Sequence, residues 1–149
     1  MKEVRFIAVG SDMNKANEFT CEFISEIYLN KKEYVKFKNI DVRCFSAEDA
    51  IDLDNLMWSY PKNIFLPHEL INTSCGNNFI NIGYPGVKFN SQKEKLLVNL
   101  NPDLPKDFSN YTYMYQFIIE DSGYLRGSAA KTWKKCKDIG LIPIFEKNK

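Results

Sequence analysis

The sequence predicts an α/β fold: a single three-layer domain in which a largely parallel sheet is flanked by helices. The run from Val4 to Val9 is apolar at almost every position, as expected for a strand in a sheet that is covered on both faces. After this run the apolar spacing changes to the helical period, and strand-like and helix-like stretches then alternate along the chain. A length of 149 residues suits one domain with its own core, so we expect a single domain over residues 1–149.

The first strand is followed by a turn and a long amphipathic helix. The turn, Gly10-Ser11-Asp12, holds one glycine and no suitably placed lysine, whereas a phosphate-binding turn needs a glycine-rich loop before the next helix. We therefore expect a Rossmann-like arrangement without a nucleotide site. Apolar residues at helical spacing predict the first helix, from Ala16 to Tyr28.

The second helix has the clearest local signals. The lysine-rich segment from Asn30 to Asp41 comes before it, and its pattern fits a helix extension, a hairpin arm or a loop. Residues Val42 to Phe45 are typical of the second strand. Ser46 and Asp49 have the spacing of a capping box, which predicts the start of a helix, and Pro61 predicts its end.

Shorter elements follow. The apolar run from Ile64 to Leu66 has strand character, and Pro67-His68 should break the strand and turn the chain. Periodicity and β-branched content predict three more strands, one helical turn and a last helix: Phe79–Ile82, Leu96–Leu100 and Tyr113–Ile119 for the strands, Asp107–Asn110 for the turn, and Asp121 or Ser128 to Asp138 for the helix.

Composition and charge exclude several classes of function. The formal net charge is +1, so no global basic field would hold nucleic acid, although residues 126–149 carry seven Lys or Arg against two acids. The four cysteines show no CxxC pair and no Cys/His spacing suited to zinc, so we expect free thiols, no metal and no cofactor. No segment has transmembrane length and the first residues lack a signal-peptide pattern, which favours a cytoplasmic protein without membrane contact.

His68 is the only histidine and the first candidate for catalysis. It stands beside Glu69 and seven residues before Cys75, so the residue types of a nucleophile and a base are present. No nucleophile elbow precedes it and no third group completes a triad, so backbone hydrogen bonding explains this histidine better. A small α/β nucleotide-processing or hydrolytic enzyme, acting near Gly10 or His68, is the alternative function, and no motif supports it.

Two tryptophans beside polar or basic residues are the strongest candidates for a binding site. Trp58 precedes Tyr60 by two residues, and Trp133 is followed by Lys134-Lys135 in the last helix. Either tryptophan alone would be ordinary, because aromatic residues on amphipathic helices usually face the core. Lysines around an aromatic pocket, however, suit a short acidic peptide that ends in an aromatic residue and a free carboxylate. Direct nucleic-acid binding by the same helix is a weaker alternative, since the near-neutral charge predicts little affinity.

The segment from Leu53 to His68 resembles a family motif. Its residues Leu53-Asp54, Leu56, Trp58, Pro61 and Phe65-Leu66-Pro67-His68 are similar to the LDxxLW…P…FxPH segment of the chi subunit of bacterial DNA polymerase III, an accessory protein of the clamp loader. The resemblance extends over nearly the whole chain through Cys21-Glu22 and through Glu120-Asp121-Ser122, which is followed by a basic, aromatic helix ending at Gly140.

This resemblance implies a non-catalytic replication subunit with two protein partners. One partner is the acidic C-terminal tail of single-stranded-DNA-binding protein, so nucleic acid would be reached only indirectly. The other is the psi subunit, which would form a heterodimer with this chain and join it to the clamp loader. For the tail, the resemblance implies Trp58, Trp133 and Lys134, with Lys131 or Arg126 compensating for Ala130, where relatives can carry an arginine. For psi, it implies a surface made by Phe65, Leu66, Pro67 and His68.

Overall fold

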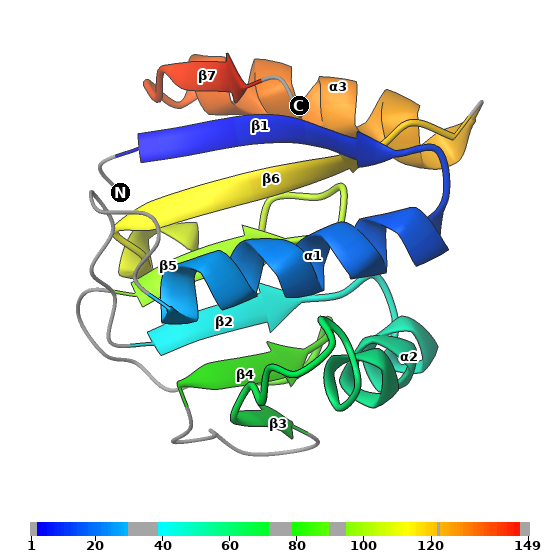
Figure 1. Ribbon diagram of the computed structural model, residues 1–149. Helices are drawn as coiled ribbons and strands as arrows, with labels where there is room; N and C mark the ends of the chain where they lie inside the picture. Colours follow the sequence, from blue (N-terminus) through cyan, green and yellow to red (C-terminus); the bar gives the residue numbers. More distant parts are fainter. Residues whose placement is uncertain (1–2, 30–38, 72–78, 90–94, 122, 147–149) are drawn as a thin grey trace.

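The computed structural model describes residues 3–29, 39–71, 79–89, 95–121 and 123–146. Within these residues, seven parallel strands form one sheet in the order β3-β4-β2-β5-β6-β1-β7 (Figure 1). The strands are β1 (Glu3–Gly10), β2 (Asn39–Arg43), β3 (His68–Leu70), β4 (Ile80–Gly83), β5 (Lys95–Asn99), β6 (Tyr113–Ile119) and β7 (Pro143–Glu146). The helices are α1 (Met13–Tyr28), α2 (Ala47–Met57) and α3 (Tyr124–Asp138), with a 3-10 turn, η1, at Phe108–Asn110. The predicted α/β fold class is confirmed.

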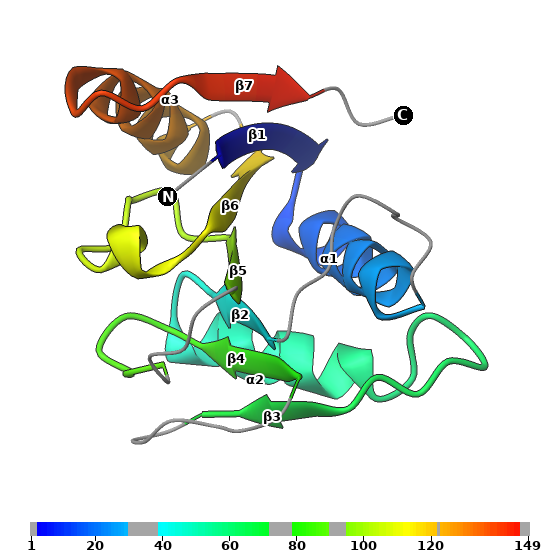
Figure 2. The same ribbon diagram turned by 90° about the vertical axis from the view of Figure 1, so that its left-hand side faces the viewer.

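Helices cover both faces of the sheet, which gives the three predicted layers (Figure 2). Helices α1 and α2 pack on one face, where Leu53 and Val42 belong to the larger hydrophobic core. Helix α3 packs on the opposite face, beside β6 and β7, where Cys136 and Phe6 belong to a smaller core. Tyr111, from the segment after β5, completes this smaller core. Connecting segments therefore cover the part of the second face that α3 does not reach.

Side-chain caps explain where two helices begin. The carboxylate of Asp12 accepts a hydrogen bond from the backbone N–H of Lys15 at 2.8 Å and caps α1. The hydroxyl of Ser46 accepts one from the backbone N–H of Asp49 at 3.2 Å, so the predicted cap of α2 is confirmed. Each cap satisfies a backbone donor that the first helical turn leaves unpaired.

Several predicted strands need correction. The apolar run at 64–66 is not a strand, and His68 begins β3 instead of ending a strand, because it pairs in register with Ile80 of β4. Strand β2 covers Asn39–Arg43 and not Val42–Phe45, since its register follows the neighbouring β4 and β5. Strand β7 was not predicted. It begins with a proline, which an edge strand tolerates at its first residue.

Some predictions concern residues outside the described part of the chain. The segment from Asn30 to Asp41 is described only from Asn39 onward, and Cys75 also lies outside the described residues. The three described cysteines, Cys21, Cys44 and Cys136, are free thiols and buried. No helix among the described residues is both long and apolar enough to span a membrane.

Candidate protein-interaction surfaces

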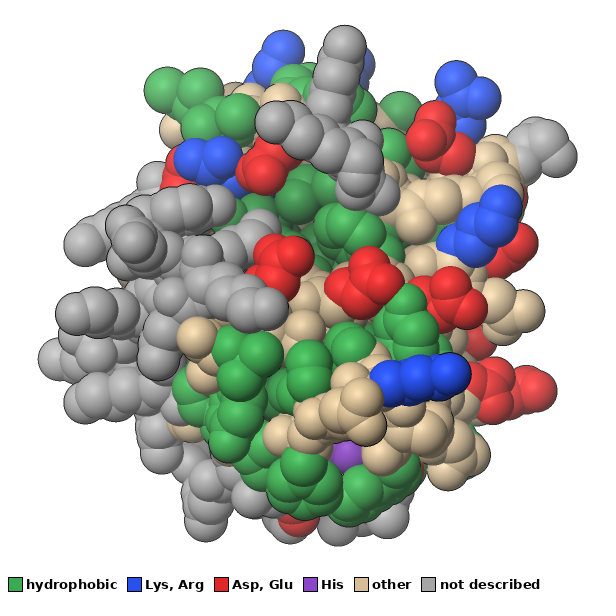
Figure 3. Space-filling model, in the orientation of Figure 1, with side chains coloured by type: hydrophobic (Ala, Val, Ile, Leu, Met, Phe, Trp, Pro, Cys, Tyr) green, Lys and Arg blue, Asp and Glu red, His purple; other side chains and the backbone are tan. Residues whose placement is uncertain are grey.

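Two large aromatic side chains form an exposed patch at the end of α2. Trp58, which caps α2, is 56% exposed, and Phe65, in the segment before β3, is 66% exposed. Their ring centroids lie 6.0 Å apart. We call these two residues the aromatic patch. Figure 3 shows hydrophobic side chains gathered around the single histidine at this end of the molecule.

The buried side chain of His68 supports the aromatic patch from the interior of the protein. Its Nδ1 lies 2.6 Å from the carbonyl oxygen of Leu66, and its Nε2 lies 3.3 Å from the carbonyl oxygen and 3.2 Å from the carboxylate of Asp54. The Trp58 ring packs on the imidazole with centroids 4.3 Å apart. Because both ring nitrogens contact oxygen atoms of the scaffold, the geometry favours a structural histidine over a catalytic base.

The four residues predicted for the psi interface therefore divide into two groups. Phe65 is exposed and Pro67 is half-buried, whereas Leu66 and His68 are buried. The buried pair positions the exposed pair. Trp58 was assigned to the tail site with Trp133, but the structure places it against Phe65 and His68 instead.

An acidic helix borders the aromatic patch. Glu18, Glu22 and Glu26 are exposed on α1, and acidic side chains cross the middle of this face in Figure 3. Tyr60, two residues after Trp58, donates a hydrogen bond to the carboxylate of Glu22 and so links the α2 end to α1. This hydrogen bond, with burial and the nearby charge acting in the same direction, raises the pKa of Tyr60 to about 12.

A second surface lies at the other end of the sheet, beside α3. It is a groove of about 430 Å³ between α3 and the strands β1, β6 and β7. Trp133 is half-buried there and packs edge-to-face on Phe6 at 4.9 Å, while the ammonium group of Lys137 lies 5.5 Å from the tryptophan ring centroid. We call this cavity the α3 groove. Its lining residues are Phe6, Ala8, Ile118, Glu120, Arg126, Ala129, Ala130, Trp133 and Phe145.

The structure brings together only part of the predicted tail site. Arg126 and Trp133 both line the α3 groove. Lys131 lines a different cavity, which it shares with Arg43, and Lys134 is exposed on α3 without lining either one. Trp58 contacts His68, the first residue of β3, and therefore lies at the opposite end of the sheet.

Sequence reasoning missed the strand residues of the α3 groove. Phe6 and Ala8 alternate with Ile7 and Val9, which belong to the core on the other face of the sheet. The alternation of side chains along β1 was therefore the feature of the sequence that could have placed Phe6 and Ala8 on the face of the groove. Phe145 was missed because β7 was not predicted. Within the described residues, no group of three His, Cys, Asp or Glu side chains gathers as a metal site would require.

Comparison with known proteins identifies the family. The family model described as DNA polymerase III chi subunit, HolC, matches residues 1–143. DNA polymerase III subunit chi of Haemophilus influenzae is 26% identical over 121 residues, which are 80% of this chain and 78% of that protein. DNA polymerase III subunit chi of Escherichia coli is 22% identical over 148 residues, 95% of each chain. The chain therefore belongs to the family of DNA polymerase III chi subunits.

Proposed function

We propose that this chain is a non-catalytic subunit of the DNA polymerase III holoenzyme that bridges two proteins during DNA replication. It would attach to the clamp loader through psi, and it would bind the acidic C-terminal tail of single-stranded-DNA-binding protein. Both contacts would form in the cytoplasm. Membership of the chi family supports the place in polymerase III. The observation that carries the bridging role is that the aromatic patch contacts β3 and the α3 groove is lined by β7. These two strands are the opposite edges of one sheet (Figure 1).

The aromatic patch is the proposed psi interface. Trp58 and Phe65 present a large apolar area, and the contacts of Trp58 with His68 hold it in one orientation before the partner arrives. Pre-organised aromatic anchors of this kind carry much of the binding energy in protein interfaces, because little conformational freedom is lost on binding. Leu66 and His68 contribute by supporting the patch, and Pro67 lies at its border.

The α3 groove is the proposed site for the acidic tail. Trp133 and Phe145 give it apolar walls that suit a terminal aromatic side chain, and Arg126 at its edge suits a carboxylate. Glu120 also lines the groove and disfavours anions near it, so we expect the carboxylate on the Arg126 side. Lys134 adds positive charge on the same helix.

The expected affinity is modest. One buried aromatic side chain contributes about 1.5–3 kcal/mol, and each exposed ion pair contributes about 0.2–1 kcal/mol. After the costs of association, affinity on the order of micromolar follows, and it should weaken with salt. Such a contact acts as a tether that gains strength when the partner presents several tails.

A peptide titration tests the tail site. The probe is a labelled acidic peptide that ends in Asp-Ile-Pro-Phe, used with a free and with an amidated C-terminus. We expect binding to the free form, loss on amidation, and roughly threefold to fivefold weaker binding for Arg126→Gln, as one exposed ion pair predicts. Lys62→Gln, which removes an exposed lysine near the aromatic patch, is the charge-matched control. Equal binding of the free and amidated peptides would exclude the α3 groove as the tail site.

A further inference from the structure

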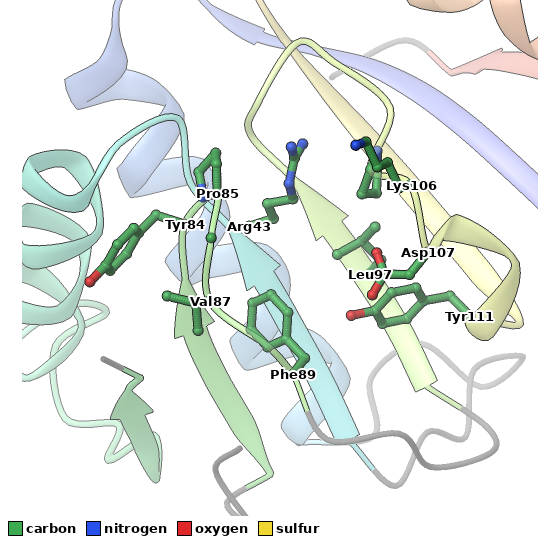
Figure 4. Close-up of a pocket in the computed structure, with 11 residues that line it drawn as sticks. Arg43, Tyr84, Pro85, Val87, Phe89, Leu97, Lys106, Asp107 and Tyr111 are labelled. Atoms are coloured by element: carbon green, nitrogen blue, oxygen red, sulfur yellow. The ribbon is translucent and has the colours of Figure 1, made fainter. Parts of the chain in front are cut away.

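A second cavity beside α3 is lined by positively charged residues. Its volume is about 380 Å³, and it shares no lining residue with the α3 groove. Arg43 at the end of β2, Lys106 in the segment after β5, and Lys131 and Lys135 of α3 line it, and Asp103 is the acid among its lining residues. Arg43 and Lys106 also line a neighbouring pocket, where Figure 4 shows both side chains at one end. We call the cavity beside α3 the basic cavity.

Hydrogen bonds fix the walls of the basic cavity. Thr132 of α3 donates a hydrogen bond from its hydroxyl to the carbonyl oxygen of Pro102, which joins α3 to the segment after β5. Nη1 of Arg43 donates hydrogen bonds to the carbonyl oxygen of Asp103 at 2.8 Å and to the amide oxygen of Asn99 at 3.3 Å. The guanidinium is therefore held in place before any anion arrives.

Arg43 has the features of an anion-binding residue. Burial outweighs the nearby charges of Asp103 and Asp107 and lowers the pKa of its guanidinium, because desolvation disfavours the charged form. The two oxygen atoms that it contacts belong to neutral groups, a peptide carbonyl and a side-chain amide. A guanidinium has further donors at Nε and Nη2, whose planar arrangement suits a carboxylate. A carboxylate bound there would offset the cost of desolvation.

The outer surface of α3 connects the basic cavity to the α3 groove. Successive residues of an α-helix lie about 100° apart around its axis. Trp133 lines the α3 groove, Lys134 is exposed, and Lys135 lines the basic cavity. Lys134 therefore lies on the outer surface between the two sites. A peptide that leaves the groove over α3 would pass Lys134 before it reaches the basic cavity.

We propose that the basic cavity binds carboxylates of the same acidic peptide whose terminal residue occupies the α3 groove. This inference rests on the proposed tail site and adds a second contact farther along the peptide. The path over the helix is longer than the helix diameter of about 10–12 Å. Since an extended chain covers about 3.3 Å per residue, the acidic side chains at the basic cavity should lie about four to six residues before the terminal one.

Carboxylates suit the basic cavity better than the phosphates of a nucleic-acid strand. Single-strand sites combine a basic groove with aromatic side chains on which the bases stack. None of the described residues that line the basic cavity is aromatic. The formal net charge of +1 also gives the chain no broad attraction for a polyanion. For a peptide, the aromatic contact lies instead at the other end of the path, in the α3 groove.

Titrations of the full chain with two labelled peptides test this inference. The probes are Asp-Asp-Asp-Ser-Ile-Pro-Phe and Asn-Asn-Asn-Ser-Ile-Pro-Phe, both with a free C-terminus. We expect the Asp peptide to bind roughly threefold to tenfold more tightly by fluorescence anisotropy, as about two or three exposed ion pairs predict. The difference should shrink as the salt concentration rises. In NMR titrations, the Asp peptide alone should shift the backbone amide signals of Asp103, Leu104 and Lys106.

A double variant makes the test specific. Lys106→Gln combined with Lys135→Gln removes two exposed lysines of the basic cavity. This variant should reduce the difference between the peptides to about twofold or less and leave the affinity for the Asn peptide unchanged. Lys15→Gln combined with Lys62→Gln removes two exposed lysines that do not line the basic cavity, and it should keep the full difference. NMR spectra of both double variants check their folding.

Equal binding of the two peptides to the wild type, or a difference that the Lys106→Gln and Lys135→Gln variant keeps, would overturn the inference. The proposed tail site would still stand in that case if Arg126→Gln weakened both peptides. Failure of both peptides to bind would overturn the tail site and this inference together. Oligothymidylate that binds more tightly than the Asp peptide, and loses its binding in the same double variant, would assign the basic cavity to nucleic acid and contradict the inference.

Discussion

The buried imidazole of His68 helps to hold the two exposed rings of the aromatic patch in position. His68→Ala removes the contacts to Leu66 and Asp54 and leaves space under Trp58. We expect a loss of about 2–4 kcal/mol in the free energy of unfolding, because a cavity and unpaired buried oxygens remain. Phe65→Ala should change the free energy of unfolding by less than about 0.5 kcal/mol, since that ring is exposed.

Both substitutions should nevertheless weaken psi binding, Phe65→Ala by removing an anchor and His68→Ala by releasing Trp58. Urea unfolding measures the stability of each variant, and copurification with psi measures its binding. The two measurements together separate a loss of stability from a loss of binding. Equal loss of stability in both variants would contradict the division between exposed contacts and buried support.

The motif from Leu53 to His68 shows how far residue-level prediction reaches. The resemblance to the chi family groups these residues into one motif, and the structure connects Asp54, Trp58 and His68 by direct contacts. Which of them face solvent was not predictable, because the burial of Leu66 and His68 depends on how the chain returns from α2 to β3. The prediction that backbone hydrogen bonds hold His68 is confirmed.

At the scale of elements, α3 depends on an aspartate just before its first turn. The Asp121 carboxylate accepts hydrogen bonds from the backbone N–H groups of Arg126, Gly123 and Leu125, at 3.1, 3.2 and 3.4 Å. Burial of the carboxyl acts to raise its pKa, but these hydrogen bonds outweigh burial and hold the pKa of Asp121 below its ordinary value. A carboxylate with a lowered pKa stabilises the folded state while it is ionised.

Asp121→Ala is therefore expected to destabilise the start of α3 and to weaken tail binding through Arg126. The difference in free energy of unfolding from the wild type should be fully present above about pH 4, the ordinary pKa of an aspartate. It should shrink as the pH falls through the lower pKa of the folded state. Amide hydrogen exchange at Leu125 and Arg126 measures the same loss locally, and unchanged exchange at neutral pH would contradict the capping role.

Elements with local signals were predicted, whereas β7 and the correct bounds of β2 and β3, which depend on distant pairing, were not. The cap of α2 and the periodicity of α1 lie within a few residues, so the sequence displays them. Strand β7 forms by pairing with β1. Arg5 of β1 and Glu146 of β7 contact each other at 3.0 Å, although they lie near opposite ends of the sequence. A four-residue strand that starts with proline has no periodicity of its own to reveal this pairing.

At the scale of the whole molecule, the order of the strands separates Trp58 from Trp133. The alternation of strands and helices predicted a parallel sheet, but it does not state which strand lies beside which. In the observed order, β3 and β7 are the two edges, so the aromatic patch near β3 and the α3 groove near β7 lie far apart. The prediction grouped the two tryptophans by their polar or basic neighbours and by the resemblance, and so joined residues that lie on two different surfaces.

This separation predicts that the two proposed partners bind at the same time. The labelled tail peptide should bind the free chain and its complex with psi with affinities that agree within about twofold, because sites without a shared contact or conformational change have little coupling. Trp58→Ala should reduce psi binding and leave peptide binding unchanged, while Arg126→Gln should do the reverse. Anisotropy titrations with and without saturating psi measure both quantities. A psi-dependent loss of peptide affinity of about tenfold or more would correspond to roughly 1.4 kcal/mol of coupling, and the chain would then switch between partners instead of joining them.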